Sequence, residues 1–330
     1  MKLRPCDHLN GFLSLALCLF WLQLPTVGEA CNNFPEKLAF YYGWPSLVNQ
    51  SNADTNRATD VFSACDAVVF GDGIEHVSHG DHVRIQTIIQ NLKQYGTNVY
   101  GYIDLSVTVS NLSFQQIATY ADEWVSMGAA GIFLDQAGYD FSVSRQRLNS
   151  VVDYVHHKGL SAFINAWNPD DVFSPGVDKI YNPTDAATHL GENDFYLLES
   201  FAVENSTYQD PAFLISRANK ALHWNDEYGT MIATVNTVAA NNPPFNQNQF
   251  AYVWWTTLLY NFDAMAWGET ANYSATSLTL PYHERPNPGD IGDPIWPIKV
   301  TNRGSQNARR TTKGTIRVDT SAHIGSFSQK

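Results

Sequence analysis

The chain has 330 residues, 44% of them hydrophobic and 13% aromatic, which is enough apolar material for one large domain. Residues 31–280 carry 10 Lys and Arg and 26 Asp and Glu, whereas residues 281–330 carry 8 Lys and Arg and 4 Asp and Glu. The formal net charge of the whole chain is −12. An acidic body repels nucleic acid and anionic membranes, so neither is expected as a partner, although solubility alone explains the charge equally well.

Residues 1–30 have the pattern of a secretory signal peptide. Lys2 and Arg4 precede the apolar run GFLSLALCLFWLQL, and small residues follow, with cleavage expected near Ala30. The alternative is a membrane anchor, but this run of 14 residues is shorter than the roughly 20 that a spanning helix needs. We therefore expect a secreted, extracellular protein with no membrane contact after signal cleavage.

The remaining cysteines and the sequons fit an oxidising compartment. Cys6 and Cys18 lie in the signal, which leaves Cys31 and Cys65 as a pair. A disulfide between them is expected, with two buried thiols as the alternative. Glycosylation is expected at four Asn-x-Ser/Thr sequons, namely Asn49, Asn111, Asn205 and Asn272.

From Lys37 onward, short β-rich apolar runs alternate with stretches of helical periodicity. Segments such as 84–95, 113–128, 145–159 and 250–261 have the spacing of helices, and several end in glycine. Eight alternations favour an α/β fold of the (β/α)8 TIM-barrel class over an open doubly wound sheet. Strands are expected at residues 37–44, 66–73, 98–105, 131–135, 161–167, 194–200, 229–236 and 263–268.

The barrel domain is expected to span residues 31–280, and residues 281–330 form an extension of different composition. Five prolines between positions 281 and 297 predict an extended stretch. A hairpin is expected around TTKGTIRVD at 311–319, with a disordered tail as the alternative.

Polar and aromatic side chains stand at nearly every strand end, where the active site of such a barrel lies. Side chains alternate along a strand, so Asp135 shares a face with Phe133. Glu199 shares a face with Leu197 in the same way, and both acids point inward if those neighbours do. Asp135 and Glu199 are therefore two candidate carboxylates for one site. The residues expected to bind substrate are Tyr42, Trp44, Asp72, Asp104, Asn165, Trp167, Asn168, Trp267 and Glu269.

Paired carboxylates flanked by tryptophans suit glycoside hydrolysis. One acid protonates the leaving oxygen while the other attacks or activates water. Aromatic faces stack on the C–H surfaces of sugars, and Asn and Asp bind the hydroxyls. The fourth and sixth strands lie two strand spacings apart, roughly 9–10 Å, which leaves both the retaining and the inverting geometry open.

The motif GIFLDQAGYDF, with FGDG, GYIDL, NAWNP and LLESF at matching strand ends, resembles the spherulin-4-like and endo-α-1,4-polygalactosaminidase-like barrels over about residues 37–270. The resemblance implies that Asp135 and Glu199 are the catalytic pair of an endo-acting hydrolase. It also implies a galactosamine- or N-acetylgalactosamine-containing polymer as substrate, which is cationic when partly deacetylated and so agrees with the acidic body. Relatives often have Glu where this chain has Gln136, and we expect this side chain to face away from the site or lie in the loop.

Two other functions remain open. The Gln136 departure is consistent with a carbohydrate-binding barrel that has lost catalysis. A metal-dependent polysaccharide deacetylase would draw its ligands from His76, His79, Asp81 and His82. A solvated helix start explains these four residues better, so no metal and no cofactor are expected.

Two arginines follow the GIFLD motif. Arg145 and Arg147 are expected to neutralise Asp140 or other loop acids. The chain has no phosphate-binding loop, nucleophile elbow, HExxH or CxxC motif, which argues against nucleotide-dependent, serine-esterase, zincin and thioredoxin-like chemistry.

Overall fold

The computed structural model describes residues 33–71, 73–238, 244–269 and 278–330. Eight parallel strands close into a barrel in the order β1-β10-β9-β6-β5-β4-β3-β2, which confirms the expected TIM-barrel class. The strands are β1 (Glu36–Tyr41), β2 (Ala67–Phe70), β3 (Asn98–Asp104), β4 (Gly131–Asp135), β5 (Ser161–Asn165), β6 (Phe195–Leu198), β9 (Met231–Thr237) and β10 (Ala264–Gly268). The expected signal peptide, Cys31, Asp72 and Asn272 lie outside the described residues.

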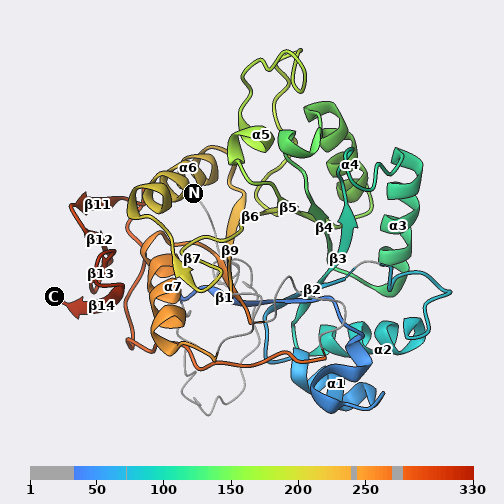
Figure 1. The fold of residues 1–330 in the computed structure, drawn as a ribbon, viewed down its shortest axis with the longest axis horizontal. Helices are drawn as coiled ribbons and strands as arrows, with labels where there is room; N and C mark the ends of the chain where they lie inside the picture. The colour runs from blue at the N-terminus through green and yellow to red at the C-terminus, as the bar shows by residue number, and fades with distance from the viewer. Residues whose placement is uncertain (1–32, 72, 239–243, 270–277) are drawn as a thin grey trace, which may run out of the picture.

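Seven α-helices surround the barrel in the described ranges (Figure 1), together with two short 3-10 helices at Pro45–Gln50 and Tyr139–Phe141. The α-helices are α1 (Thr55–Phe62), α2 (His82–Gln94), α3 (Phe114–Met127), α4 (Arg145–His157), α5 (Pro169–Phe173), α6 (Pro211–Tyr228) and α7 (Gln247–Leu259). After β10, the described chain resumes at residue 278 and forms neither helix nor strand up to residue 293. None of the described helices is both long and apolar enough to cross a membrane.

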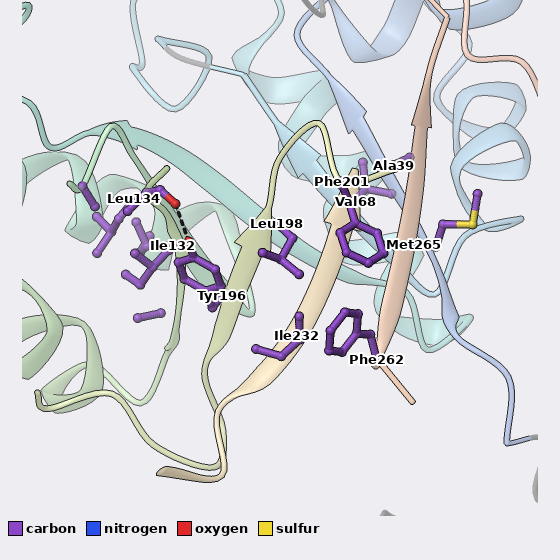
Figure 2. Packing of buried hydrophobic residues seen from close by; sticks show 14 of the residues in the cluster. Ala39, Val68, Ile132, Leu134, Tyr196, Leu198, Phe201, Ile232, Phe262 and Met265 are labelled. Atoms are coloured by element: carbon purple, nitrogen blue, oxygen red, sulfur yellow. Dashed lines mark hydrogen bonds between the residues drawn. The ribbon is translucent and has the colours of Figure 1, made fainter. Parts of the chain in front are cut away.

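Side chains alternate along the strands between two apolar layers. The barrel interior contains an aromatic cluster in which the ring centroids of Phe133 lie 5.3 Å from those of Phe40 and 5.1 Å from those of Phe163. The outer layer packs between the strands and the helices. Figure 2 shows part of this outer layer, including Ile132, Leu134, Tyr196, Leu198 and Ile232. Because Phe133 and Leu197 belong to the interior, the next side chain on the same face of each strand also points inward.

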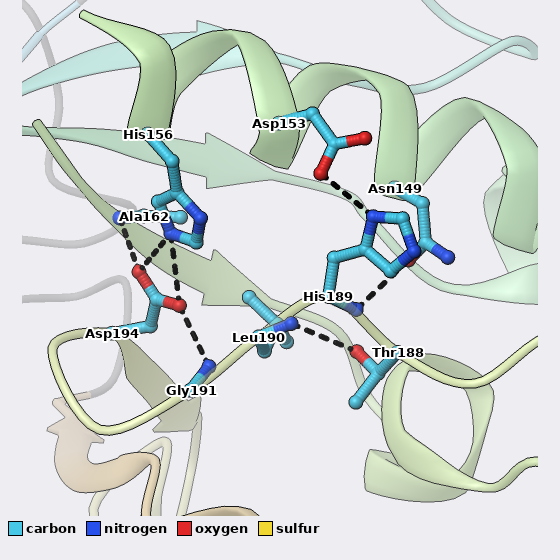
Figure 3. A network of polar contacts seen from close by, with 9 residues as sticks. All are labelled: Asn149, Asp153, His156, Ala162, Thr188, His189, Leu190, Gly191 and Asp194. Carbon is cyan, nitrogen blue, oxygen red and sulfur yellow. Dashed lines mark hydrogen bonds and ion pairs between the residues drawn. The ribbon is translucent and has the colours of Figure 1, made fainter. Parts of the chain in front are cut away.

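A buried carboxylate anchors the loop that leads into β6 (Figure 3). Asp194 is 1% exposed and accepts hydrogen bonds from the backbone N–H groups of Ala162 and Gly191, both at 2.8 Å. Its Oδ1 also lies 2.8 Å from Nε2 of His156 on α4. This network satisfies a carboxylate that would otherwise be costly to bury.

Two arginines of α4 hold loops near the start of that helix. Arg145 is buried and donates to the backbone carbonyls of Ala186, Asp171 and Ser174. Arg147 donates to the carbonyls of Leu105 and Leu112. Among the described residues no ion pair joins either arginine to Asp140, and the guanidinium groups anchor loops because their five donors satisfy several carbonyls at once. The charges of two other acids, Asp171 and Asp104, favour the protonated forms of Arg145 and Arg147.

The C-terminal extension is a four-stranded antiparallel sheet beside α7 (Figure 1). Its strands are β11 (Val300–Arg303), β12 (Gln306–Arg310), β13 (Gly314–Asp319) and β14 (Ile324–Gln329). The expected hairpin is present as β12 and β13, and two further strands extend it. Buried Arg309 fastens the sheet to α7 by donating to the carbonyls of Leu258 and Leu259, both at 2.8 Å.

Candidate active site

A pocket of about 480 Å³, here called the mouth pocket, lies at the carboxyl ends of the barrel strands and contains both expected catalytic acids. Asp135 is the last residue of β4, and Glu199 directly follows β6. Each acid comes two residues after an interior side chain, Phe133 or Leu197, and both line the pocket. The strand alternation therefore delivers the two carboxylates to one cavity, as the sequence predicts.

Asn165, the last residue of β5, lies between the two acids. Its Nδ2 donates to Asp135 Oδ1 at 2.8 Å and to Glu199 Oε2 at 3.0 Å. These two oxygens are therefore separated by no more than the total of the two distances, about 5.8 Å. One amide group thus fixes the relative position of both carboxylates.

Asp135 accepts two further hydrogen bonds. The hydroxyl of Tyr102, on β3, donates to Oδ2 at 2.8 Å, and the backbone N–H of Gln136 donates to Oδ1 at 2.9 Å. Burial raises the pKa of Asp135 above the ordinary Asp value, while the hydrogen bonds from Tyr102, Asn165 and Gln136 oppose this rise. The donors therefore favour the ionised form of a carboxylate that its surroundings desolvate.

Glu199 is less well supplied with donors. Burial raises its pKa, the hydrogen bond from Asn165 lowers it, and the charge of Asp135 raises it. Arg217 of α6 also opposes the rise, and its guanidinium donates to the backbone carbonyl of Glu199 at 2.9 Å. The guanidinium carbon lies 4.5 Å from the centroid of the Trp167 ring, so Arg217 links the acid to an aromatic wall of the pocket.

The pocket has a strongly acidic lining. Asp140 and Glu204 line it together with Asp135 and Glu199, and no Lys, Arg or His does so among the described residues. Four carboxyl groups without a cation in the wall favour the binding of a positively charged ligand.

The pocket brings together three of the residues expected to bind substrate, namely Tyr42, Asn165 and Trp167. Asp104 instead accepts hydrogen bonds from the backbone of Ser106 and the hydroxyl of Ser110, which shape the loop after β3. Asn168 caps α5 and bonds the Asp171 carboxylate. These two strand-end residues therefore serve local structure and do not line the pocket.

Trp44, Trp267 and Glu269 also lie outside the pocket, contrary to expectation. Trp44 follows β1 and packs edge-on against His79. On β10 the interior positions are Ala264 and Ala266, so Trp267 faces outward and packs on Phe250 of α7. Glu269 pairs with His283 of the extended C-terminal segment.

Some polar residues in or beside the pocket were not expected to bind substrate, among them Tyr102, which contacts Asp135 without lining the pocket. Tyr102 could have been identified, because it shares the face of interior Tyr100 on β3. Gln136 lies in the loop directly after β4, which is one of the two expected placements, and its left-handed backbone (φ 54°) turns the chain there so that the residue also lines the pocket. Asp140 lies in the short 3-10 turn Tyr139–Phe141 and Glu204 in the two-residue strand β7 (Val203–Glu204), both outside the barrel strands whose alternation predicts inward side chains.

The four residues that the alternative, a metal-dependent deacetylase, would use as ligands do not converge. Asp81 accepts from the backbone and hydroxyl of Ser46, and His76 Nδ1 lies 2.6 Å from Glu123 Oε2. Within the described ranges, the set of His and carboxylate side chains close enough to share an ion is Glu75, His76 and Glu123, with ligand atoms within 4.8 Å of one another. None of the three lines the mouth pocket, and the close His76–Glu123 pair accounts for two of them without an ion.

Three sequons are described, and their asparagines, Asn49, Asn111 and Asn205, are exposed. The Asn49 amide also exchanges two hydrogen bonds with the backbone of Leu280, both at 2.9 Å. Burial raises the pKa of the Cys65 thiol to about 11, and Cys65 forms no disulfide with a described residue. The pairing with Cys31 therefore stays a prediction.

Comparison with known proteins gives only distant structural similarities. A scan against protein-family models finds no match, and a search of curated proteins finds no relative. Among solved structures, the chain is similar to a beta-arabinopyranosidase (TM-score 0.28, 12% identity), covering 41% of this chain and only 23% of that one. It is similar to a GH18 chitinase from Pseudoalteromonas aurantia (TM-score 0.43, 12% identity), covering 71% of this chain and 93% of that one. It is also similar to an HpcH/HpaI aldolase from Desulfitobacterium hafniense DCB-2 (TM-score 0.41, 9% identity), covering 71% of this chain and 86% of that one. With TM-scores below 0.5, these similarities carry no argument about function.

Proposed function

We propose that this protein is a glycoside hydrolase in which Asp135 is the nucleophile and Glu199 the general acid and base. The observation that carries the proposal is the Asn165 amide in contact with both carboxylates inside the mouth pocket. Two carboxyl groups held side by side in a cleft are the arrangement on which most glycosidases depend.

The spacing supports a retaining mechanism. Retaining enzymes hold their carboxyl groups about 5–5.5 Å apart, and inverting enzymes about 6.5–9.5 Å apart. The oxygens that Asn165 bridges lie within about 5.8 Å, which leaves little room for a water molecule between a carboxylate and the sugar.

The hydrogen bonds support the assignment of roles. Asp135 receives three donors that stabilise its ionised form, as a nucleophile requires, whereas Glu199 receives one side-chain donor. In the first step Glu199 gives its proton to the glycosidic oxygen while Asp135 Oδ attacks the anomeric carbon, so one C–O bond breaks and an ester C–O bond forms. In the second step Glu199 takes a proton from water, whose oxygen attacks the same carbon and releases the Asp135 carboxylate.

The substrate we propose is a polymer that contains galactosamine or N-acetylgalactosamine, cleaved internally. The family resemblance suggests this class, and the acidic lining supports a partly deacetylated, cationic form. Trp167 is 44% exposed at the pocket and offers a ring on which a pyranose can stack.

The experiment is a polymer panel with mass-spectrometric detection of released oligosaccharides. Wild type should act on partly deacetylated galactosaminogalactan and not on neutral galactan, and Asp135→Asn and Glu199→Gln should lose about a thousandfold or more in rate. Asp140→Asn, a pocket carboxylate outside the pair, is the matched control and should raise KM while kcat changes little. No release from any amino-sugar polymer would refute the proposal.

The second candidate function is a carbohydrate-binding barrel without turnover, and the observation that favours it is Gln136 in the pocket wall. It predicts glycan binding without product, unchanged by Asp135→Asn and by Glu199→Gln. Restored hydrolysis in Gln136→Glu would then identify the missing carboxylate as the cause.

We also propose that the protein is secreted and that residues 1–30 are removed. In the mature protein, Cys31 and Cys65 form a disulfide and the sequon asparagines are glycosylated. The charged and apolar pattern of the signal and the exposure of three sequon asparagines support this. Intact-mass and N-terminal analysis of the protein from the culture medium, with and without glycosidase and reductant, tests all three points. A mature chain that begins before residue 30 would contradict the assignment of the signal.

A further inference from the structure

The C-terminal sheet has two chemically different faces. Along β12, Asn307 and Arg309 are buried, whereas Gln306 and Arg310 point outward and are exposed. Along β13, Ile316 and Val318 are fully buried and Arg317 is exposed. The inner face packs against α7, so the outer face stays open to a partner.

A groove of about 670 Å³ runs over this outer face, bounded by the exposed side chains of Ile295 and Trp296. Four of its lining side chains are cationic, and none is acidic. They are Lys299, Arg303, Arg310 and Arg317. In a chain with 32 acidic against 20 basic residues, such a surface is unusual.

The groove cations are not neutralised by neighbouring carboxylates. Within the described part of the chain, Lys299, Arg303 and Arg310 have no ion pair, and Arg317 donates to the Ser328 hydroxyl. Asp319 lies on β13 two residues after Arg317, and its oxygens accept hydrogen bonds from Gln306 and from the backbone N–H of Ser321. The positive charge of the groove is therefore available to a ligand.

The sheet register spreads these charges along the groove. Arg317 pairs with Ala308, which lies two residues from Arg310 on the neighbouring strand. The two arginines are thus diagonal neighbours, about 7–8 Å apart at the backbone. Separated cations suit a ligand that repeats its negative charge, and not a single small anion.

We propose that this groove binds an acidic, uronate-bearing polysaccharide, with Trp296 stacked on a sugar ring and the arginines paired with carboxylates. Arg forms two parallel hydrogen bonds with a carboxylate, and the C–H face of a pyranose packs on an indole. Trp296 and Ile295 are 44% and 43% exposed, an apolar rim that a phosphodiester backbone would not use. The groove shares no residue with the mouth pocket, so this inference does not depend on the proposed hydrolase activity.

The test is affinity electrophoresis of the full secreted chain in native gels that contain polygalacturonate. Wild type should be retarded, and about 0.5 M salt should abolish the retardation by screening. The double variant Arg310→Gln/Arg317→Gln should bind about tenfold or more weakly, and Trp296→Ala should also bind more weakly. Lys313→Gln/Lys330→Gln is the matched control, because it removes two exposed cations of the same extension that do not line the groove.

Each alternative outcome is distinct. No retardation of wild type, or equal loss in the Lys313/Lys330 control, would overturn the proposal. If Trp296→Ala binds polygalacturonate as well as wild type does, the polysaccharide assignment is overturned in favour of a general polyanion surface. The same conclusion follows if gels that contain oligo-dT retard wild type as strongly as gels that contain polygalacturonate. Thermal unfolding of each exposed-site variant should match wild type. A lowered Tm in the double variant would attribute its loss of binding to misfolding and would contradict the assignment of those arginines to an exposed face.

Discussion

Tyr102→Phe is expected to move one limb of the pH–activity profile and leave the other in place. The Tyr102 hydroxyl donates to Asp135 Oδ2 at 2.8 Å and helps to keep the pKa of that buried carboxyl from rising further. Without the donor the pKa of Asp135 rises. The nucleophile is then protonated at a higher pH, so the acid limb of kcat/KM shifts upward.

The size of the effect follows from the bond that is lost. A hydrogen bond to a charged acceptor contributes about 1.5–3 kcal/mol, so kcat/KM on the acid side should fall roughly ten- to a hundredfold. On the alkaline side Asp135 is ionised in both proteins, and the limb set by Glu199 should not move. An aryl glycoside of the amino sugar, assayed across about pH 3–9, provides the profile.

Tyr95→Phe is the matched control, because this tyrosine is 62% exposed at the end of α2. Its profile should coincide with that of wild type. An unmoved acid limb in Tyr102→Phe would refute the assignment of Asp135 as the ionised nucleophile, and a shift of the alkaline limb alone would indicate that the two roles are reversed.

Three further predictions concern stability, measured by urea unfolding. Glu199→Gln should gain about 1 kcal/mol of unfolding free energy at pH 7. The reason is that the pKa of Glu199 is raised in the folded state, so wild type loses stability as pH rises above the ordinary Glu value of about 4.3. Below that pH the variant should show no gain. Asp194→Asn should lose about 2–3 kcal/mol because it weakens a buried, charge-assisted network, whereas Asp153→Asn, on the exposed neighbouring pair in Figure 3, should stay within about 0.5 kcal/mol. Gly101→Ala should lose about 3 kcal/mol because the new Cβ would lie 2.0 Å from a buried indole of α3. Gly191→Ala is the control, because its Cβ would enter open space and stability should change little. Equal losses in the two variants would refute the packing argument.

The sequence predicted the barrel well because strand and helix periodicities are local and repeat eight times. The same alternation predicted that Asp135, at the end of β4, and Glu199, directly after β6, point into one cavity. Applied to β10, it would have excluded Trp267, since Ala264 and Ala266 occupy the interior.

Other features of the site could not be read from periodicity. The left-handed backbone of Gln136 depends on how the chain turns after β4, and the hydrogen bonds of Asp104 depend on the path of the following loop. The bridging role of Asn165 required the three-dimensional order of β4, β5 and β6, in which its strand lies between those of the two acids. Such contacts follow from tertiary packing and not from local sequence.

Azide rescue with an activated aryl glycoside of the amino sugar tests the central claim most directly. In Asp135→Ala, azide takes the place of the missing nucleophile and should give a glycosyl azide of inverted anomeric configuration. In Glu199→Ala, azide intercepts the glycosyl ester on Asp135 and should give the retained configuration. Proton NMR of the two products identifies them. If azide restores neither variant, or if both products have the same anomeric configuration, the assignment of nucleophile and acid/base in this pocket is wrong.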